Sequence, residues 1–410
     1  MKIILSNKIN LNLFSIVLIS ALPLSILMGS AIINSFVILI DFLFLIELTR
    51  NKNIKYLNNK LFYAFIFFWL SLWINVFFSD YPGNSMLRAL GFIRFIFLVF
   101  AIKYYFSLNN YFYKEKIFQI WFIIFLLVSG DLIFEFFFGF NTLGYNNNFP
   151  GRLSGFLDQE LKIGHFYYGF VLITLSFIFY KFKNLPLLFF FISFFLIISF
   201  LIGERSNFIR TFLILSFFTF FINKKLILKK IFFIFTLLIV IGSIIFFHND
   251  SKERFYTMLI NPLITNLGVS SILKHTHYGA HYDTAIKIFR NNIIFGIGLK
   301  NFRHESGKKK YINNEYQYNA MRQTTHPHQI HFELLSEVGL FGYLSFLGFF
   351  TYYFVSKSKK QTENNKLYRI SGILFVLSIF IPLLPSGSFF TTYGATIFWI
   401  NFSMIETFNN

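Results

Sequence analysis

The stretch PLLFFFISFFLIISFLI, residues 186–202, contains no charged side chain. An α-helix needs about 20 mostly apolar residues to cross a bilayer, so this stretch has close to the length of one span. Similar runs recur along the chain of 410 residues, of which 55% are hydrophobic and only 13% are charged. This composition is too apolar for a soluble protein of that length and is typical of a protein that crosses a membrane many times.

Twelve such runs predict an all-α, polytopic integral membrane protein with about 12 transmembrane helices. The predicted spans are residues 11–28, 31–48, 61–78, 88–106, 117–138, 163–180, 186–202, 205–222, 231–247, 331–354, 368–384 and 389–406. We expect residues 1–247 to hold helices one to nine, residues 248–330 to form one large periplasmic loop, and residues 331–410 to hold helices ten to twelve. The three parts are expected to form a single membrane domain.

The basic residues predict the orientation of these spans. The formal net charge is +19, and more than half of the 37 lysines and arginines fall in alternate short loops, which the positive-inside rule assigns to the cytoplasm. We interpret this excess as contact with anionic membrane lipids. Because the basic residues form no stripe on a soluble fold, we expect no nucleic-acid partner. The chain has no cysteine, which excludes disulfides and thiol chemistry.

The predicted periplasmic loop holds seven of the nine histidines. His277 and His281 are spaced i,i+4, and His275 is close by, which is one arrangement that binds Zn²⁺. No carboxylate or cysteine stands at a metal-binding spacing, so solvated loop histidines are the preferred interpretation. We therefore expect no metal and no cofactor.

Several arginines lie where charge is costly, and an intramembrane charge usually marks a working site. In GERSNFIR, Arg205 stands at the outer end of a predicted span and Arg210 lies deeper, about 140° away around the helix. The alternative for Arg205 is an interfacial side chain paired with Glu204. Arg152, flanked by glycines in GRLSGFLDQELKIGHF, lies in a loop that is either a ligand site or simply solvated.

Arg88 and Arg94 lie on the fourth predicted span. Arg94 is the deeper residue and needs a partner, for which Asp131 and Glu135 of the next span are candidates. The sequence leaves open whether this is a structural pair or a ligand contact.

The stretch THPHQIHFELLSEVGLFG, residues 325–342, places polar residues at the start of the tenth span. Thr325 as a cap and a proline in the first turn predict a helix N-terminus with His328 in that turn. Such a terminus attracts anions and keeps a histidine neutral, so that it can accept a proton. Glu333 and Glu337 share one face of this helix. Gly339 and Gly342 leave room for a second helix to pack closely.

This pattern resembles the signature of bacterial O-antigen ligases and polymerases: His328–Gln329, nine residues, Gly339, two residues, then Gly342. The last motif position is often threonine or valine in that family and is Tyr343 here. The segments GRLSGFLDQELKIGHF, GERSNFIRTFLI and AIKIFRNNIIFGIGLKNF also resemble segments of ligase-like and polymerase-like members. The resemblance covers most of the chain from about residue 140 to residue 342.

The resemblance implies a metal-independent, inverting glycosyltransferase that moves a glycan from undecaprenyl pyrophosphate to an acceptor. The acceptor is lipid A core for a ligase and a second lipid-linked repeat unit for a polymerase of O-antigen or exopolysaccharide. The implied location is the bacterial inner membrane, with the active site facing the periplasm. His328 corresponds to the family's essential histidine and is the expected base, and His326 substitutes or assists.

The remaining expected roles follow from the same chemistry. Arginine forks match phosphate oxygens, so Arg205, Arg152 and Arg210 are the candidates for binding pyrophosphate. Glu333 or Glu337 is expected to orient the base or bind sugar hydroxyls. A transporter of lipid-linked substrates is the alternative from another class, but it favours two repeated halves and charges near the midplane, which the sequence lacks.

Overall fold

The computed structural model describes residues 2–108, 111–146, 149–158, 160–222, 226–265, 269–356 and 363–408. Within these ranges the regular elements are helices, and the only β-structure is an isolated bridge between Phe140 and Asn146. The all-α prediction is therefore confirmed for the described residues. The α-helices are α1 (Lys2–Ser20), α2 (Leu22–Leu27), α3 (Ser30–Arg50), α4 (Lys60–Phe77), α5 (Pro82–Ser107), α6 (Tyr111–Phe138), α7 (Ile163–Phe182), α8 (Leu185–Leu201), α9 (Arg205–Ile222), α10 (Ile227–Phe247), α11 (Asn249–Ser251), α12 (Asn261–Thr265), α13 (Val269–Lys274), α14 (His277–Asn291), α15 (Phe302–Glu305), α16 (Ile330–Ser356), α17 (Glu363–Ile379) and α18 (Thr392–Thr407). Shorter elements are the 3₁₀ turns η1 (Ile54–Leu57), η2 (Gly155–Leu157), η4 (Lys309–Tyr311) and η5 (Asn319–Arg322) and the π-helical segment η3 (Lys252–Ile260).

Every predicted span falls on helical structure, and the first span is divided between α1 and α2. Among the described residues, 8 helices are long and apolar enough to cross a membrane, namely α3, α4, α5, α6, α7, α9, α10 and α16. Helices α8, α17 and α18 are shorter, with 17, 17 and 16 residues. The chain is thus a multi-pass membrane protein, and the count of twelve spans remains a prediction.

Helix α17 ends earlier than its predicted span. The prediction ran to residue 384, whereas the helix stops at Ile379. Pro382 follows closely, and a proline both lacks an N–H for the helix and disfavours helical backbone in the residue before it. Residues 380–391 therefore form an irregular connection between α17 and α18.

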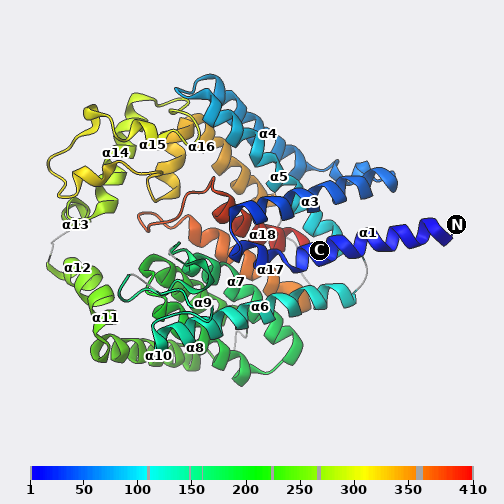
Figure 1. Cartoon of the computed structure of the whole chain (residues 1–410), viewed down its shortest axis with the longest axis horizontal. Coiled ribbons are helices and arrows are strands. Elements are labelled where there is room, and N and C mark those ends of the chain that lie inside the picture. The colour runs from blue at the N-terminus through cyan, green and yellow to red at the C-terminus, as the bar shows by residue number, and fades with distance from the viewer. Residues whose placement is uncertain are drawn as a thin grey trace.

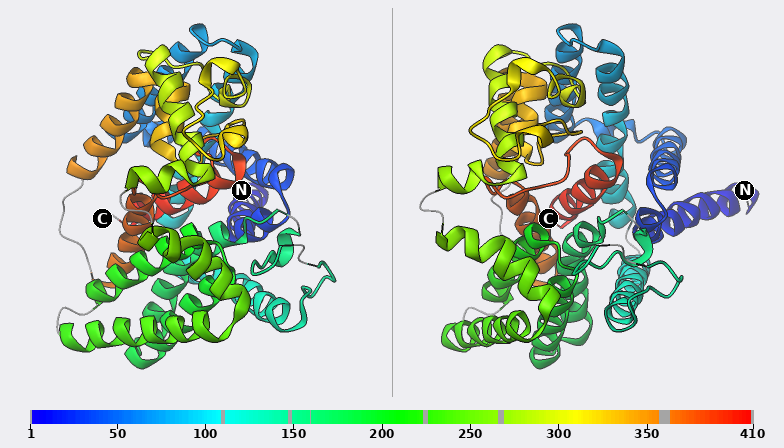
Figure 2. Two further views of the ribbon diagram at one scale, coloured as in Figure 1. Left: turned by 90° about the vertical axis from the view of Figure 1, so that its left-hand side faces the viewer. Right: turned by 60° about the vertical axis from the view of Figure 1, so that its left-hand side comes forward.

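Helices α17 and α18 lie in the middle of the molecule, as Figure 1 and Figure 2 show. Helices α3, α4, α5 and α16 lie on one side of this pair, and α6 to α10 lie on the other (Figure 1). The outer helices differ greatly in burial: 83% of the apolar window of α7 is buried, compared with 17% in α10. Both helices are apolar, and they differ in how they pack. Helix α7 faces the rest of the protein, whereas α10 exposes an apolar face that suits contact with lipid.

Residues 248–329 separate α10 from α16, as predicted. The described part of this segment consists of the short elements α11 to α15 with η3, η4 and η5, and contains no helix of membrane-spanning length and hydropathy. Helix α14 packs against α16, which brings this segment to the start of the histidine stretch (Figure 1). Its position on the periplasmic side stays a prediction.

Helix α16 is interrupted at Gly339, whose φ of 65° and ψ of −170° are not helical. The chain at residues 293–298 docks into this break, where the N–H of Leu340 donates to Ile293 O at 2.8 Å and the N–H of Gly298 donates to Glu337 O at 2.8 Å. A side chain at Gly339 would overlap the backbone of the docked segment. The room predicted at this glycine is therefore filled by the turn and loop of residues 293–298, and the prediction of a packed helix there is wrong.

Candidate active site

His328 lies immediately before α16 rather than within its first turn. Its φ of 57° places it in a left-handed turn, which histidine adopts more readily than most residues. The side-chain oxygen of Gln329 accepts hydrogen bonds from the N–H groups of His331 at 2.7 Å and Phe332 at 3.2 Å. The prediction that Thr325 caps a helix containing His328 is therefore wrong, because Gln329, four residues after Thr325, supplies the capping oxygen.

Three histidine rings meet at this turn, and we call His281, His326 and His328 the histidine cluster. The ring centroids of His281 and His328 are 5.1 Å apart, and those of His326 and His328 are 4.0 Å apart. His281 Nε2 lies 2.9 Å from Met321 O, and because a carbonyl only accepts, this nitrogen carries the proton. His281 Nδ1 and His326 Nε2 are buried without a hydrogen-bond partner among the described residues.

The histidine cluster is held in the neutral form. Burial, with a further contribution from His281, lowers the pKa of His328 to about 4. Burial, followed by the charges of His328 and Lys300, lowers the pKa of His326 to about 2. The expected neutrality is thus found, but its cause is burial among other imidazoles rather than a helix N-terminus.

The histidines considered as a metal site have other contacts. His275 Nδ1 lies 2.8 Å from Ser271 O, and the His277 ring packs on Tyr318 with centroids 3.9 Å apart. The described residues contain no group of three or more histidine, aspartate or glutamate side chains arranged to hold a metal ion.

Glu333 and Glu337 are fully buried, and both carboxylates contact Lys300, Glu333 at the side chain and Glu337 at the backbone N–H. Glu333 accepts from the N–H of Phe389 at 2.8 Å and from the hydroxyl of Ser388, and lies 4.0 Å from Lys300 Nζ. Glu337 accepts from the N–H of Lys300 at 2.8 Å. Both carboxylates are at 0% exposure, so their contacts favour a positioning role over direct contact with a sugar.

Arg152 and Arg205 come together at the ends of α8 and α9 with a third arginine, Arg254, which the sequence did not single out. Arg205 Nη1 donates to Met258 O at 2.7 Å, and Arg152 Nη2 lies 3.5 Å from Glu204 Oε1. Glu204 therefore pairs with Arg152, and the alternative in which it pairs with Arg205 is wrong. We call Arg152, Arg205 and Arg254 the α9 arginine cluster.

The three cations of the α9 arginine cluster act on one another. Burial, followed by the charges of Arg152 and Arg205, lowers the pKa of Arg254 to about 10. The Nε atoms of Arg152 and Arg254 are buried without a partner in the described part of the chain. Among the described residues, Glu204 is the one carboxylate within ion-pair distance of these three arginines, so the cluster retains positive charge that suits a phosphate group.

Arg210 is separate from this cluster, as the helical spacing predicts. Its side chain is 1% exposed, and it donates to Pro385 O at 2.7 Å, to Leu384 O at 2.9 Å and to Ser378 O at 3.3 Å. It therefore holds the connection between α17 and α18. The nearby N–H of Ser386 donates to His328 O at 2.7 Å, so this connection also fixes the histidine turn.

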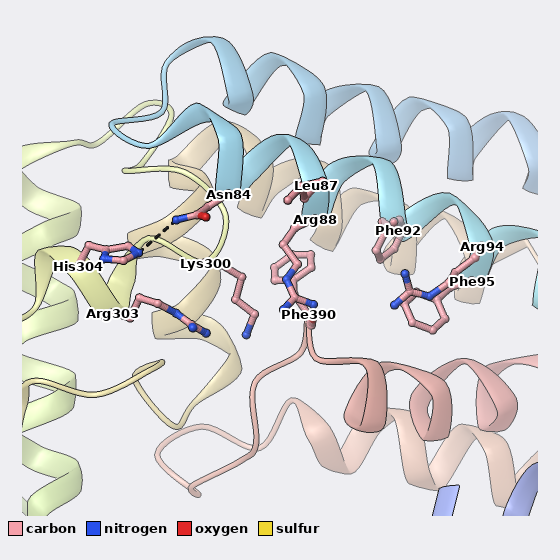
Figure 3. A pocket seen from close by; sticks show the side chains of 11 residues that line it. Asn84, Leu87, Arg88, Phe92, Arg94, Phe95, Lys300, Arg303, His304 and Phe390 are labelled. Carbon is pink, nitrogen blue, oxygen red and sulfur yellow. Dashed lines mark hydrogen bonds between the residues drawn. The ribbon is translucent and has the colours of Figure 1, made fainter. Parts of the chain in front are cut away.

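The carboxylates proposed to neutralise Arg94 have other partners. Asp131 accepts from the N–H of Thr142 at 2.8 Å, and Glu135 accepts from the N–H of Gly155 at 2.7 Å. Both hold the loop after α6, so the predicted pairing with Arg94 is wrong. Arg94 instead lies in a cavity beneath α5 with Arg88 (Figure 3).

Residues 187–347 match the family model described as O-antigen ligase. This match supports the O-antigen ligase-like superfamily. The match begins in α8, continues through the α10–α16 segment and ends in α16 after the break. No curated protein matches the chain.

Within this O-antigen ligase-like chain, the matched residues include the histidine cluster, Arg205, Arg210 and Arg254. Arg152 lies outside the matched residues, and the fold brings it to Glu204, which is next to Arg205 in the sequence. The superfamily is a group of glycosyltransferase-like ligases and polymerases, so the match supports an enzyme acting on lipid-linked glycans.

The residue that departs from the superfamily pattern has a specific contact. His331 Nε2 lies 2.9 Å from Phe380 O and so carries the proton, which leaves Nδ1 to accept from the hydroxyl of Tyr343 at 3.0 Å. Tyr343 therefore fixes a histidine next to the motif.

Proposed function

We propose that the chain transfers a glycan from undecaprenyl pyrophosphate to lipid A core at the periplasmic face of the bacterial inner membrane. The observation that carries the proposal is the neutral histidine cluster, in which His281 Nδ1 and His326 Nε2 have no partner among the described residues, beside a surplus of arginine charge. Tyr278 links the two features: its ring lies 5.8 Å from that of His328, and its hydroxyl is close enough to Arg205 to interact with its charge.

In this mechanism, His328 is the general base. Its neutral ring accepts the proton of an acceptor hydroxyl, and the acceptor oxygen forms a bond to the anomeric carbon of the donor. The bond between that carbon and the pyrophosphate oxygen breaks, which leaves undecaprenyl pyrophosphate with one more negative charge and inverts the anomeric centre. His326 is the second candidate for the base, and neither role needs a metal ion.

Arg205 and Arg152, together with Arg254, are proposed to bind the pyrophosphate. Guanidinium groups offer paired donors to phosphate oxygens, and they stabilise the charge that develops on the leaving group. Arg210, whose donors are taken by backbone carbonyls, is proposed to position the α17–α18 connection instead. Glu333 and Glu337 are proposed to position Lys300 and the same connection.

A polymerase of O-antigen or exopolysaccharide repeats uses the same donor and the same bond changes, and differs in its acceptor. A strain that lacks this chain distinguishes the two when its envelope glycans are separated by size and tested for linkage to the carrier lipid. Bare lipid A core with polymer left on undecaprenyl pyrophosphate supports the ligase, and core bearing a single repeat unit supports the polymerase. Unchanged glycans would contradict both and favour a transporter.

A further inference from the structure

A cavity of about 520 Å³ lies between α5, α15 and the start of α18, apart from the α9 arginine cluster. Figure 3 shows side chains from all three regions pointing into it. We call it the α5 cavity. Its lining residues are Asn84, Leu87, Arg88, Gly91, Phe92, Arg94, Phe95, Lys300, Arg303, His304 and Phe390.

Four of the lining residues are cations, Arg88, Arg94, Lys300 and Arg303, and none is an aspartate or glutamate. In Figure 3 the charged ends of Arg88, Lys300 and Arg303 gather beneath α5, with Arg94 farther along the helix. Three buried carboxylates behind the lining act on these cations: Asp41 on Arg94, and Glu333 and Glu337 on Arg88 and Lys300. Glu333 lies 4.0 Å from Lys300 Nζ and also binds the α17–α18 connection. Four cations against three carboxylates leave an excess of positive charge, and all of the charge on the cavity wall itself is positive.

The donors of the arginines are weakly used, whereas Lys300 Nζ donates to the hydroxyl of Ser388 at 2.5 Å. Arg88 Nη1 lies 3.4 Å from Phe390 O, and Arg94 Nη2 lies 3.3 Å from the hydroxyl of Thr392, both at the long end of hydrogen-bond range. In the part of the chain that the structure describes, Arg94 Nε is buried without a partner, and Arg303 is exposed and makes no hydrogen bond or ion pair. An anion in the cavity would satisfy these donors.

The other half of the lining is apolar and continues to the outside of α5. Phe92, Phe95 and Phe390 are buried around the arginines, while Leu87 and Leu90 are 67% and 54% exposed on the same helix. Arg88 and Arg94 are six residues apart, which is about 9 Å along a helix. This combination suits a phosphate headgroup inside and a lipid chain on the apolar surface.

The histidine cluster lies between the two basic regions. His326 is close enough to Lys300 and Arg303 of the α5 cavity for their charges to lower its pKa. His328 packs on Tyr278, which faces Arg205 of the α9 arginine cluster. A base between two phosphate sites can reach one substrate from each side.

We propose that the α5 cavity binds the phosphate or pyrophosphate group of the lipid-borne acceptor, while the α9 arginine cluster binds the donor. The inference rests on the proposed function, since it assigns the second substrate of that transfer. The shared chemistry is a lipid-linked phosphate, from a phosphorylated lipid A core in a ligase or from a second undecaprenyl pyrophosphate in a polymerase.

The test counts lipids bound to the full chain in phosphatidylcholine nanodiscs by native mass spectrometry. Undecaprenyl pyrophosphate and phosphorylated lipid A core are added separately and then together. The α5 cavity is altered by Arg88→Gln with Arg303→Gln, and the α9 arginine cluster by Arg205→Gln with Arg254→Gln. Arg290→Gln, on the exposed surface of α14, is the matched control.

We expect two bound lipids, of which the α5 cavity variant loses one. Its dissociation constant for the acceptor lipid should rise roughly tenfold or more, because hydrogen bonds to charged groups are lost. A second undecaprenyl pyrophosphate in the cavity identifies a polymerase acceptor, and lipid A core identifies a ligase acceptor. Thermal unfolding equal to that of the Arg290→Gln control shows that the variants are folded.

Two results would overturn the inference. If the wild type binds one lipid, and only the α9 arginine cluster variant loses it, the α5 cavity is not an acceptor site and the donor site stands. If the only bound undecaprenyl pyrophosphate is lost in the α5 cavity variant and kept in the α9 variant, the donor lies in the α5 cavity and the proposed assignment of the donor site fails as well.

Discussion

The break in α16 makes Gly339→Ala the sharpest single test of how the site is held. At φ 65° and ψ −170° the backbone is in a region that essentially only glycine adopts, so a side chain costs about 1–3 kcal/mol in conformational strain. The new Cβ would also lie 2.5 Å from the backbone nitrogen of Gly296, and overpacking of this kind costs typically about 1–3 kcal/mol. We expect Gly339→Ala to lower the free energy of unfolding by roughly 2–6 kcal/mol.

The matched control is Gly348→Ala, which lies in the same helix with nothing within 4 Å of its Cβ. Alanine is favoured over glycine in a helix interior by about 0.5–1 kcal/mol, so the control should unfold at the same or a higher temperature. Both variants are measured by thermal unfolding in nanodiscs, and glycan transfer is measured in cells. Since residues 293–298 lead directly to Lys300, Gly339→Ala should lose transfer as well as stability. Equal unfolding temperatures for the two variants would refute the docking argument.

Three further predictions concern the titrating and positioning groups. The free-enzyme kcat/KM should stay flat from about pH 5 to 8 and fall below pH 5 as His328 is protonated, with a midpoint at about pH 4. His281→Asn should move this midpoint upward without reaching 6.5, the ordinary pKa of histidine. A midpoint at 6.5 in the wild type would contradict the burial of His328. Arg210→Lys should lower the unfolding temperature and increase proteolysis of residues 380–391, because one ammonium group cannot reproduce three donor contacts to separate carbonyls. Unchanged proteolysis would show that Arg210 does not hold the connection between α17 and α18. Burial alone would raise the pKa of Glu305, but hydrogen bonds from Lys308, Lys310 and a tyrosine outweigh burial and lower it. The stabilisation by Glu305 is therefore present above its unfolded pKa and is lost as the pH falls below 4.5. Glu305→Gln should remove this acid sensitivity from the hydrogen exchange of residues 302–323, and a pH profile identical to that of the wild type would exclude the pairing.

The helices were predictable because each span is a long apolar run, and such runs leave the backbone few alternatives in a membrane. The ends were less predictable, since they depend on local chemistry. Pro382 ends α17 early, although the apolar run continues past it. The break at Gly339 depends on backbone from residues 293–298, which the α16 sequence does not contain.

The histidine stretch was recognisable, but its partners were not. His281 stood among loop histidines with a metal-like spacing, and only the fold brings its ring onto His328. Arg254 lay within the predicted periplasmic loop and was not singled out, whereas η3 brings it near Arg152 and Glu204. Asp131 was predicted to neutralise Arg94, because the sequence does not show that loop N–H groups already occupy that carboxylate.

The most direct test of the proposed chemistry is the rate of glycan transfer by the reconstituted protein with a His328→Gln substitution. The donor is the undecaprenyl-pyrophosphate-linked glycan purified from a strain that lacks the chain, and the acceptor is the lipid that accumulates unmodified in the same strain. His275→Gln is the control, since His275 is exposed and lies on the segment before α14. Loss of a positioned general base predicts a rate about 10²–10⁴-fold lower for His328→Gln, with unchanged folding and donor binding. Transfer at the rate of the His275→Gln control would show that His328 is not the base.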